Sequence, residues 1–202
     1  MPPLPRLIVA TRNPHKTAEI RAMLGDRFEV LDASAFPDWP AIAETGSTFL
    51  ENATLKAEGI SRRVAGWVLA DDSGLEVDAL GGAPGVWSSS YGGEEGNHAR
   101  NNARLIEEMA GKSARQARFR CTMVLAKAGS AKADFCGTVE GTLTDSARGA
   151  GGFGYDPLFI PEGFEQTFGE LGETVKNRFS HRARALAEAI SWLTRQTDGK
   201  KA

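Results

Sequence analysis

The segment from Leu69 to Leu75, with the sequence LADDSGL, most constrains the fold because an apolar run ends there in two adjacent carboxylates. Residues 68–70 are typical of the end of a buried strand, residues 73–74 of a turn, and residues 75–80 of an alternating continuation with one solvated face. Asp72 is therefore predicted at the carboxyl end of a strand. In open α/β sheets ligands bind just beyond such ends, where a carboxylate can bind a divalent cation or accept a proton from water. A solvated, Asp-rich turn is equally compatible with this short segment.

The length and charge of the chain describe an ordinary globular protein. Its 202 residues can bury roughly 70% of the unfolded surface, so one domain spanning residues 1–202, with one or two lobes, is expected. A tail from about residue 197 to 202 is expected to fray. The net charge of −2 argues against a general polyanion binder, so no nucleic-acid partner is predicted. No apolar run approaches membrane-spanning length, so no membrane partner is predicted either.

The cysteines and the start of the chain favour the cytoplasm. Cys121 and Cys136 lie in strand-like runs without CxxC or Cys/His ligand spacing, which favours buried free thiols over a disulfide framework or a zinc site. The first residues lack the basic and apolar regions of a signal peptide. Both observations predict a cytoplasmic protein.

The first strand is predicted to lead through a phosphate-binding loop into a helix. Residues 7–10 form a short apolar run, and residues 18–24 have helical periodicity up to Gly25. The intervening TRNPHK loop can meet a phosphate with backbone N–H groups and a helix N-terminus, with Lys16 as a point charge. A solvated lysine in the first turn of the helix is the alternative interpretation.

A second helix is predicted to begin at Thr48, because Thr48 and Glu51 have the spacing of a capping box. Asn52 and Lys56 share one flank of this helix, one turn apart, and Glu44 lies in the loop before it. Such residues on a helix surface usually carry no function. Here the helix leads directly into the strand with the two aspartates, so a shared target is possible.

Two later segments are predicted to carry loops with functional residues. Residues 81–93 form a long Gly/Ser-rich loop of the kind that is usually functional or an interface, and its Trp87 is expected at a dimer contact. Residues 149–154 formally satisfy GxGxxG, but Pro157 and Pro161 exclude the helix that a dinucleotide fingerprint requires. We expect this loop to lead into a short strand at residues 158–160.

The pattern of the remaining segments predicts a hairpin-like pair and a final helix. Residues 117–125 and 134–143 alternate between apolar and polar side chains, as two paired strands do. Ser180 is a suitable N-cap for the last helix. Arg182 then falls in the first turn, where a cation opposes the helix dipole unless an anion or an acceptor is bound nearby.

Six motifs, read in chain order, resemble the inosine triphosphate pyrophosphatase family. They are Thr11-x-Asn13-x-x-Lys16, ETGxTFxxNAxxKA from Glu44, DDSGL from Asp71, GGAPG from Gly81, GFGYDP from Gly152, and Ser180-His181-Arg182. The resemblance implies a two-lobed α/β/α fold with a long central mixed sheet and the active site in the cleft between the lobes. It also implies a homodimeric, Mg²⁺-dependent enzyme that converts dITP, ITP and XTP to the monophosphate and pyrophosphate, which removes deaminated purines from the nucleotide pool.

The resemblance also assigns roles to individual residues. It implies that the triphosphate is held by Thr11, Asn13, Lys16 and Lys56. It implies that the metal is held by Glu44 and Asp72, with Asp72 also the general base. It implies a purine pocket of Phe153, Gly154, Tyr155, Asp156, Lys176, His181 and Arg182, with Ser73 also at the substrate. Arg12, Pro14 and His15 complete the phosphate loop. Arg12 replaces the small residue common in the family and can add charge where Pro14 removes an N–H.

Purine selectivity is expected to depend on His181 and Arg182 in the first turn of the last helix, with Phe153 stacked on the purine ring. Hypoxanthine and xanthine present an oxygen acceptor at ring position six, whereas adenine presents an amino donor there. Arginine has only donors, so it pairs with the first two bases and is left unmatched by adenine. Guanine shares the oxygen, so its exclusion requires a separate device.

Two rival functions differ from this interpretation in their chemistry. A haloacid-dehalogenase-type phosphatase also has an aspartate at a strand end, but it needs DxD spacing, whereas Asp71 and Asp72 are adjacent. A non-catalytic nucleotide-binding module would keep the purine pocket without needing both Glu44 and Asp72. The product released, pyrophosphate, phosphate or none, separates the three.

Overall fold

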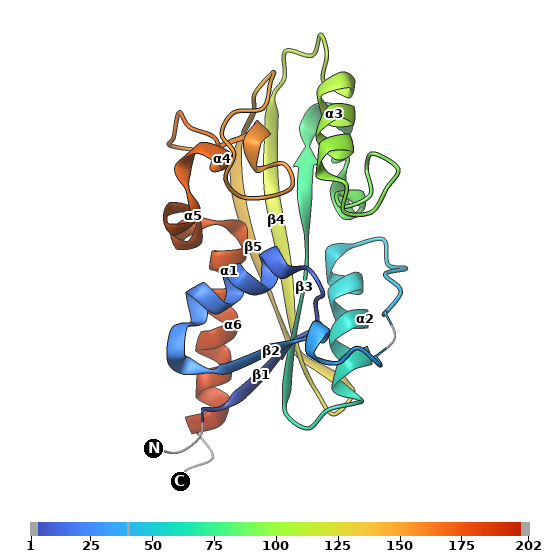
Figure 1. Cartoon of the computed structure of the whole chain (residues 1–202), viewed down its shortest axis with the longest axis vertical. Coiled ribbons are helices and arrows are strands. Elements are labelled where there is room, and N and C mark those ends of the chain that lie inside the picture. Colours follow the sequence, from blue (N-terminus) through green and yellow to red (C-terminus); the bar gives the residue numbers. More distant parts are fainter. Residues whose placement is uncertain (1–3, 40, 199–202) are drawn as a thin grey trace. The chain divides into compact units, whose positions relative to one another are not determined.

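The computed structural model describes residues 4–39 and 41–198 (Figure 1). The strands of this part of the chain are β1 (Arg6–Val9), β2 (Glu29–Asp32), β3 (Trp67–Val77), β4 (Gln116–Lys127), β5 (Ser130–Leu143) and β6 (Phe159–Pro161). Its α-helices are α1 (Pro14–Leu24), α2 (Phe49–Ser61), α3 (His98–Glu108), α4 (Phe168–Leu171), α5 (Glu173–Phe179) and α6 (His181–Asp198). Among the described residues, no helix is long and apolar enough to span a membrane. Of the tail expected to fray, residues 199–202 lie outside the described residues, and α6 includes the backbone of 197–198.

The strands form one mixed sheet, which confirms the predicted α/β class. Their order is β2-β1-β3-β4-β5-β6. The strand β1 pairs in parallel with β2 and β3, whereas β6 pairs antiparallel with β5. The predicted hairpin is also present, because β4 and β5 are joined by Ala128 and Gly129, both with positive φ, as a two-residue type I′ turn requires.

The chain divides into two compact units, and β3, β4 and β5 each contribute residues to both. The first unit comprises residues 1–72, 121–137 and 182–202, and the second comprises residues 73–120 and 138–181. Each unit is described by itself below. The cleft between two lobes stays a prediction.

In the first unit, helices cover both faces of the sheet. Alternate residues of β1 enter different hydrophobic clusters, because successive side chains of a strand point to opposite faces. Leu7 and Val9 pack with α1 and α6 through Ile20, Leu24 and Leu186. Ile8 packs with α2 through Ala53, Ala57 and Ile60. This unit therefore has the three layers of an α/β/α arrangement.

The turn predicted at Ser73 and Gly74 is wrong, because β3 continues without a break from Trp67 to Val77. Gly74 serves a close contact instead: a Cβ there would collide with the carbonyl of Gly85 and the hydroxyl of Ser88. The N–H of Leu75 donates to Ser88 Oγ over 2.9 Å. A contact thirteen residues away along the chain thus explains a glycine that resembles a turn signal.

Asp72 was predicted at the carboxyl end of a strand. It lies instead inside β3, five residues before the strand ends at Val77. The neighbouring parallel strand β1 does end at this level, since Val9 pairs with Leu69. Asp71 and Asp72 therefore follow the register position at which β1 stops. The rule that ligands bind beyond the carboxyl ends of parallel strands applies here to β1.

The second unit has its own hydrophobic core. Residues of β3 and α3, including Leu75, Leu105 and Met109, pack with the aromatic side chains of Phe119, Tyr155, Phe159 and Phe168. Phe119 meets Phe159 edge-on, with ring centroids 4.8 Å apart. These aromatic contacts support the loops and short helices between Gly149 and His181.

Both cysteines are free thiols, as predicted. Cys121 is buried in the core of the first unit, as predicted, whereas Cys136 is exposed, so the prediction of a buried thiol is wrong for Cys136. Burial raises the pKa of the Cys121 thiol to about 12, so it stays protonated and behaves as a small apolar side chain.

Candidate active site

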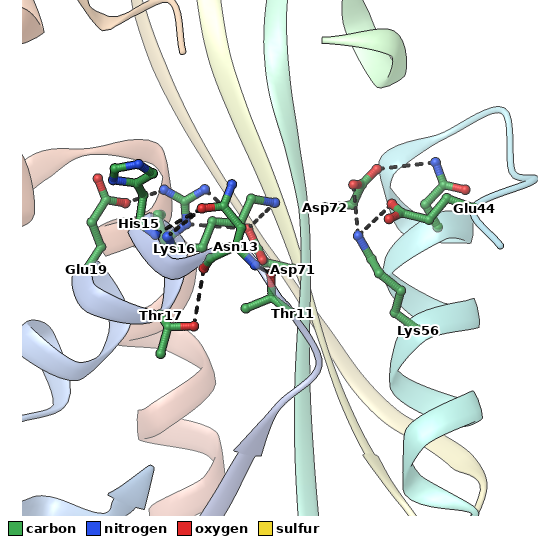
Figure 2. A network of polar contacts seen from close by, with 12 residues as sticks. Thr11, Asn13, His15, Lys16, Thr17, Glu19, Glu44, Lys56, Asp71 and Asp72 are labelled. Carbon is green, nitrogen blue, oxygen red and sulfur yellow. Dashed lines mark hydrogen bonds and ion pairs between the residues drawn. The ribbon is translucent and has the colours of Figure 1, made fainter. Parts of the chain in front are cut away.

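The loop between β1 and α1 is held in shape by its own side chains (Figure 2). Thr11 Oγ1 accepts the N–H of Asn13 over 3.1 Å. Asn13 Oδ1 accepts the N–H groups of His15 and Lys16 over 3.0 and 3.3 Å, so Asn13 caps α1. Pro14 occupies the first helical position, where an N–H has no intrahelical partner, and its missing donor costs the helix nothing. In this structure the N–H groups of His15 and Lys16 are bound to Asn13, and Lys16 supplies the charge of the loop.

Arg12 points its guanidinium at the next loop. Its Nη2 donates to the carbonyl of Trp39, whose ring stacks on Phe36 with centroids 3.8 Å apart. Arg12 therefore links the loop between β1 and α1 to the segment that contains Phe36 and Trp39. Its predicted role in adding charge at the phosphate stays a prediction.

Successive side chains of β3 divide the polar residues of the first unit into two clusters. Leu69 packs with α1 and α6, and Ala70 packs with α2, so Asp71 and Asp72 continue this alternation. Figure 2 shows Asp71 beside Lys16 and Asp72 on the other side of the strand, facing Lys56.

The first cluster, here called the anchor cluster, consists of Lys16, Glu19, Asp71 and Arg182. Lys16 Nζ lies 3.0 Å from Asp71 Oδ2, and Arg182 Nη2 lies 3.2 Å from the same oxygen. Arg182 Nη1 pairs with Glu19. The side chain of Asp71 is 0% exposed and that of Arg182 is 1% exposed. Two cations and two carboxylates make the anchor cluster formally neutral.

Asp71 and Arg182, the two least exposed members of the anchor cluster, are held in their charged forms. Burial by itself raises the pKa of Asp71, but Lys16 and Arg182 outweigh burial and hold that pKa well below its usual range. Burial lowers the pKa of Arg182, but Glu19 and Asp71 outweigh it and raise the pKa. Ion pairing therefore decides the charge of both groups at neutral pH.

The second cluster, here called the carboxylate pair, consists of Glu44 and Asp72 around Lys56. Lys56 Nζ lies 2.6 Å from Glu44 Oε2 and 3.1 Å from Asp72 Oδ1. Asn52 Nδ2 donates to Asp72 Oδ2 over 3.3 Å. Two carboxylates share one ammonium, so this cluster has a formal charge of −1.

This surplus of negative charge changes the acidity of Asp72. Burial and the charge of Glu44 raise the pKa of Asp72 to about 6, against the opposing effects of Lys56 and Lys16. Burial lowers the pKa of Lys56, but Asp72 and Glu44 outweigh it and raise the pKa. A carboxylate with a pKa near neutral pH is suited to accept a proton from water.

The carboxylate pair fits Mg²⁺. The described residues contain no group of three or more His, Cys, Asp or Glu side chains that could enclose a metal ion. Mg²⁺ characteristically takes one or two carboxylates and fills its other positions with water and substrate phosphates. Glu44 and Asp72 supply hard oxygen donors, and both already contact one cationic group, the ammonium of Lys56. Their two negative charges exceed its single positive charge.

In the second unit, three of the residues assigned to the purine pocket lie together. Lys176 Nζ is 2.6 Å from Asp156 Oδ2, and both side chains are 2% exposed. The same oxygen accepts the N–H of Phe153 over 2.8 Å, and Lys176 Nζ lies 4.7 Å from the centroid of the Phe153 ring. Gly152 has a φ of +71°, and a Cβ there would collide with Asp156. The buried ion pair thus fixes the loop that carries Phe153.

The other residues assigned to the pocket have different surroundings. His181 stacks on Phe119, with centroids 4.8 Å apart. The hydroxyl of Tyr155 donates to the carbonyl of Ser88 over 2.8 Å, and burial raises the pKa of Tyr155. The carbonyl of Gly154 accepts from Asn102 Nδ2 over 3.1 Å. Arg182 belongs to the anchor cluster of the first unit, and Ser73 follows Asp72 directly in β3.

Sequence reasoning assigned no role to three residues that contact the assigned ones: Glu19, Asp71 and Asn102. It gave Asn52, which contacts Asp72, only a possible shared target with Lys56. Glu19 follows Lys16 by three residues, so it lies on the same face of α1. Asp71 is a charged residue inside an apolar strand, where burial requires a partner. These two signals could have been used. Asn102 carries no such signal, because Gly154 lies 52 residues away along the chain.

Comparison with known proteins places the chain in one family. A dITP/XTP pyrophosphatase of Geobacillus kaustophilus is 48% identical over 185 residues, which cover 90% of this chain and 91% of that protein. A second, from Halalkalibacterium halodurans, is 46% identical over 92% of this chain and 97% of its own length. A HAM1 protein structure from Coxiella burnetii matches with a TM-score of 0.85 at 36% identity, over 95% of this chain and 99% of that chain. These findings confirm the resemblance drawn from the motifs. The model of the Ham1 family matches residues 7–192, and the chain belongs to this family.

Proposed function

We propose that this Ham1-family member is a cytoplasmic, Mg²⁺-dependent pyrophosphatase that converts dITP, ITP and XTP to the monophosphate and pyrophosphate. The names of its relatives support the substrate class. The observation that carries the proposal is that Glu44 and Asp72 both contact the ammonium of Lys56, with the pKa of Asp72 raised to about 6.

The carboxylate pair performs the hydrolytic step in this proposal. Glu44 and Asp72 would hold Mg²⁺, which would supply positive charge at the phosphate oxygens. Lys16 and Lys56 bind further phosphate oxygens and orient the chain of phosphates. Asp72 takes the proton of a water whose oxygen bonds to the α-phosphorus, while the bond from that phosphorus to the pyrophosphate oxygen breaks.

The second unit contributes the ring of Phe153 to recognition of the base in this proposal. Asp156 and Lys176 hold Phe153 so that its ring can stack on a purine. Both charges are already satisfied by one another, which leaves the fixed aromatic face as the binding feature.

The function is tested by measuring products from a panel of nucleoside triphosphates with Mg²⁺. We expect pyrophosphate from ITP, dITP and XTP, at rates at least about tenfold above those for ATP and GTP, and no turnover after chelation of the metal. Release of orthophosphate would instead indicate the phosphatase alternative. Tight binding of ITP without any product would indicate a non-catalytic module.

We also propose that the chain forms a homodimer through a surface that includes Trp87, which is 65% exposed in the second unit. Tryptophan is enriched in protein–protein interfaces relative to the rest of the protein surface. Trp87→Ser is expected to shift the mass measured by sedimentation velocity from dimer toward monomer. Leu50→Ser, at an apolar side chain 43% exposed in the first unit, is the control and should leave the mass unchanged. A fully dimeric Trp87→Ser protein would contradict this surface.

A further inference from the structure

We propose that Asp71 is a positioning residue, whose single oxygen Oδ2 fixes both the lysine that binds the triphosphate and the arginine that selects the purine. This inference rests on the proposed function and adds to it a residue that links two parts of substrate recognition.

The geometry of the anchor cluster carries the inference. Asp71 Oδ2 lies 3.0 Å from Lys16 Nζ, 3.2 Å from Arg182 Nη2 and 3.4 Å from Arg182 Nε. The two cations come from different elements, α1 and α6, which begin 167 positions apart in the sequence (181 − 14 = 167). One atom of β3 therefore sets the position of two side chains from elements that are remote in sequence.

Stability alone is a poor explanation of this arrangement. Removing ionised groups from water carries a large cost, and well-packed apolar residues in place of a buried ion pair are often neutral or stabilising. The anchor cluster nevertheless buries three charged groups, with Asp71, Arg182 and Glu19 at 0%, 1% and 8% side-chain exposure. Lys16 retains 15% exposure, so one cation of the cluster still reaches the surface of the first unit.

Because Asp71 Oδ2 contacts both Lys16 and Arg182, removing its charge should affect both side chains together. An asparagine at position 71 keeps the size of the side chain but removes the charge that attracts Lys16 and Arg182. Lys16 then loses its ion pair with Asp71, whereas Arg182 keeps its ion pair with Glu19. Handling of the triphosphate and selection of the purine should therefore deteriorate together, which loss of Lys16 alone would not cause.

The experiment compares Asp71→Asn with Asp32→Asn, a second buried carboxylate of the first unit that pairs with Arg21 and Ser34. Asp71→Asn should lower kcat/KM for ITP at least about tenfold and reduce the ratio of ITP to ATP efficiency several-fold. Glu19→Gln, which removes the charge that pairs with Arg182, should reduce the ratio of ITP to ATP efficiency but leave the difference in binding affinity between ITP and inosine unchanged. Asp32→Asn should change neither kcat/KM for ITP nor the ratio of ITP to ATP efficiency, even if it changes the melting temperature.

A double-mutant cycle separates positioning from packing. Because Asp71 acts through Lys16, the loss in kcat/KM for Asp71→Asn with Lys16→Ala should be clearly smaller than the product of the two single losses. The inference would be overturned if the loss in kcat/KM of the double variant equalled the product of the two single losses. It would also be overturned if Asp71→Asn kept the wild-type ratio of ITP to ATP efficiency. If Asp71→Asn does not fold, Asp71→Glu keeps the charge but displaces the oxygen, and an unchanged ratio in that variant would equally overturn it.

A binding measurement distinguishes failure of this inference from failure of the proposed function. Absence of pyrophosphate from the wild-type protein would refute the function. Calorimetry with ITP, ATP and inosine, with the metal chelated, tests Asp71 without turnover. Asp71→Asn should reduce the difference in binding affinity between ITP and ATP, and also the difference between ITP and inosine. Equal gaps in Asp71→Asn and the wild type would refute the role of Asp71, whether or not turnover occurs.

Discussion

Asp72→Asn is expected to lower kcat for ITP by at least ~10²-fold, the usual scale for loss of a general base. An amide can neither accept the proton of the attacking water nor contribute charge to a metal ion. The fold should survive the change. The pKa of Asp72 is raised to about 6, so its contribution to stability is complete below the ordinary carboxyl pKa and lost by pH 7. The neutral variant should therefore unfold at the same temperature as the wild type, or higher.

Glu44→Gln is the matched control, because it removes one negative charge from the same carboxylate pair. It weakens the metal site but leaves the group that takes the proton. Raising the Mg²⁺ concentration should restore part of the turnover in Glu44→Gln and none in Asp72→Asn. Near-normal kcat in Asp72→Asn at saturating Mg²⁺ would exclude Asp72 as the base.

The elements of the first unit could be predicted because their signals are local. The capping box of Thr48 and Glu51 is present in the structure, and α2 begins at the next residue, Phe49. Asn13 and Gly25 bound α1 as an N-cap and a C-cap do. In each case the physical cause lies within a few residues of its effect, so the sequence carries it directly.

The errors arise where the cause is distant along the chain. Gly74 was assigned to a turn, but its contact with Ser88 can be known only after the chain has folded. The adjacent aspartates were treated as one group, whereas the alternation of β3 directs Asp71 to Lys16 and Asp72 to Lys56. That separation depends on residues 70–72 continuing the strand, which the assumed turn concealed. The same error therefore misplaced the strand end and hid the role of Asp71.

Lys176→Met is expected to lower the free energy of unfolding by ~3–5 kcal/mol, the usual cost of removing one partner from a buried ion pair. Met preserves much of the side-chain volume, so the loss comes chiefly from the charge of Asp156, left 2% exposed without its ammonium. Urea unfolding of the variant and the wild type measures the difference. A change below ~1 kcal/mol would mean that the pair is far better solvated than its burial indicates.

The double variant Lys176→Met/Asp156→Asn tests whether the pair itself stabilises the second unit or whether only its disruption is costly. Asparagine keeps an oxygen that can accept the N–H of Phe153, now bound by Asp156 over 2.8 Å. Since no charge is then stranded in the core, the double variant should recover most of the stability lost by Lys176→Met. A folded double variant also separates two contributions to purine binding. If it binds ITP as the wild type does, the pair acts by holding Phe153 in place, and weaker binding despite full stability would mean that the charge of Lys176 contacts the nucleotide directly.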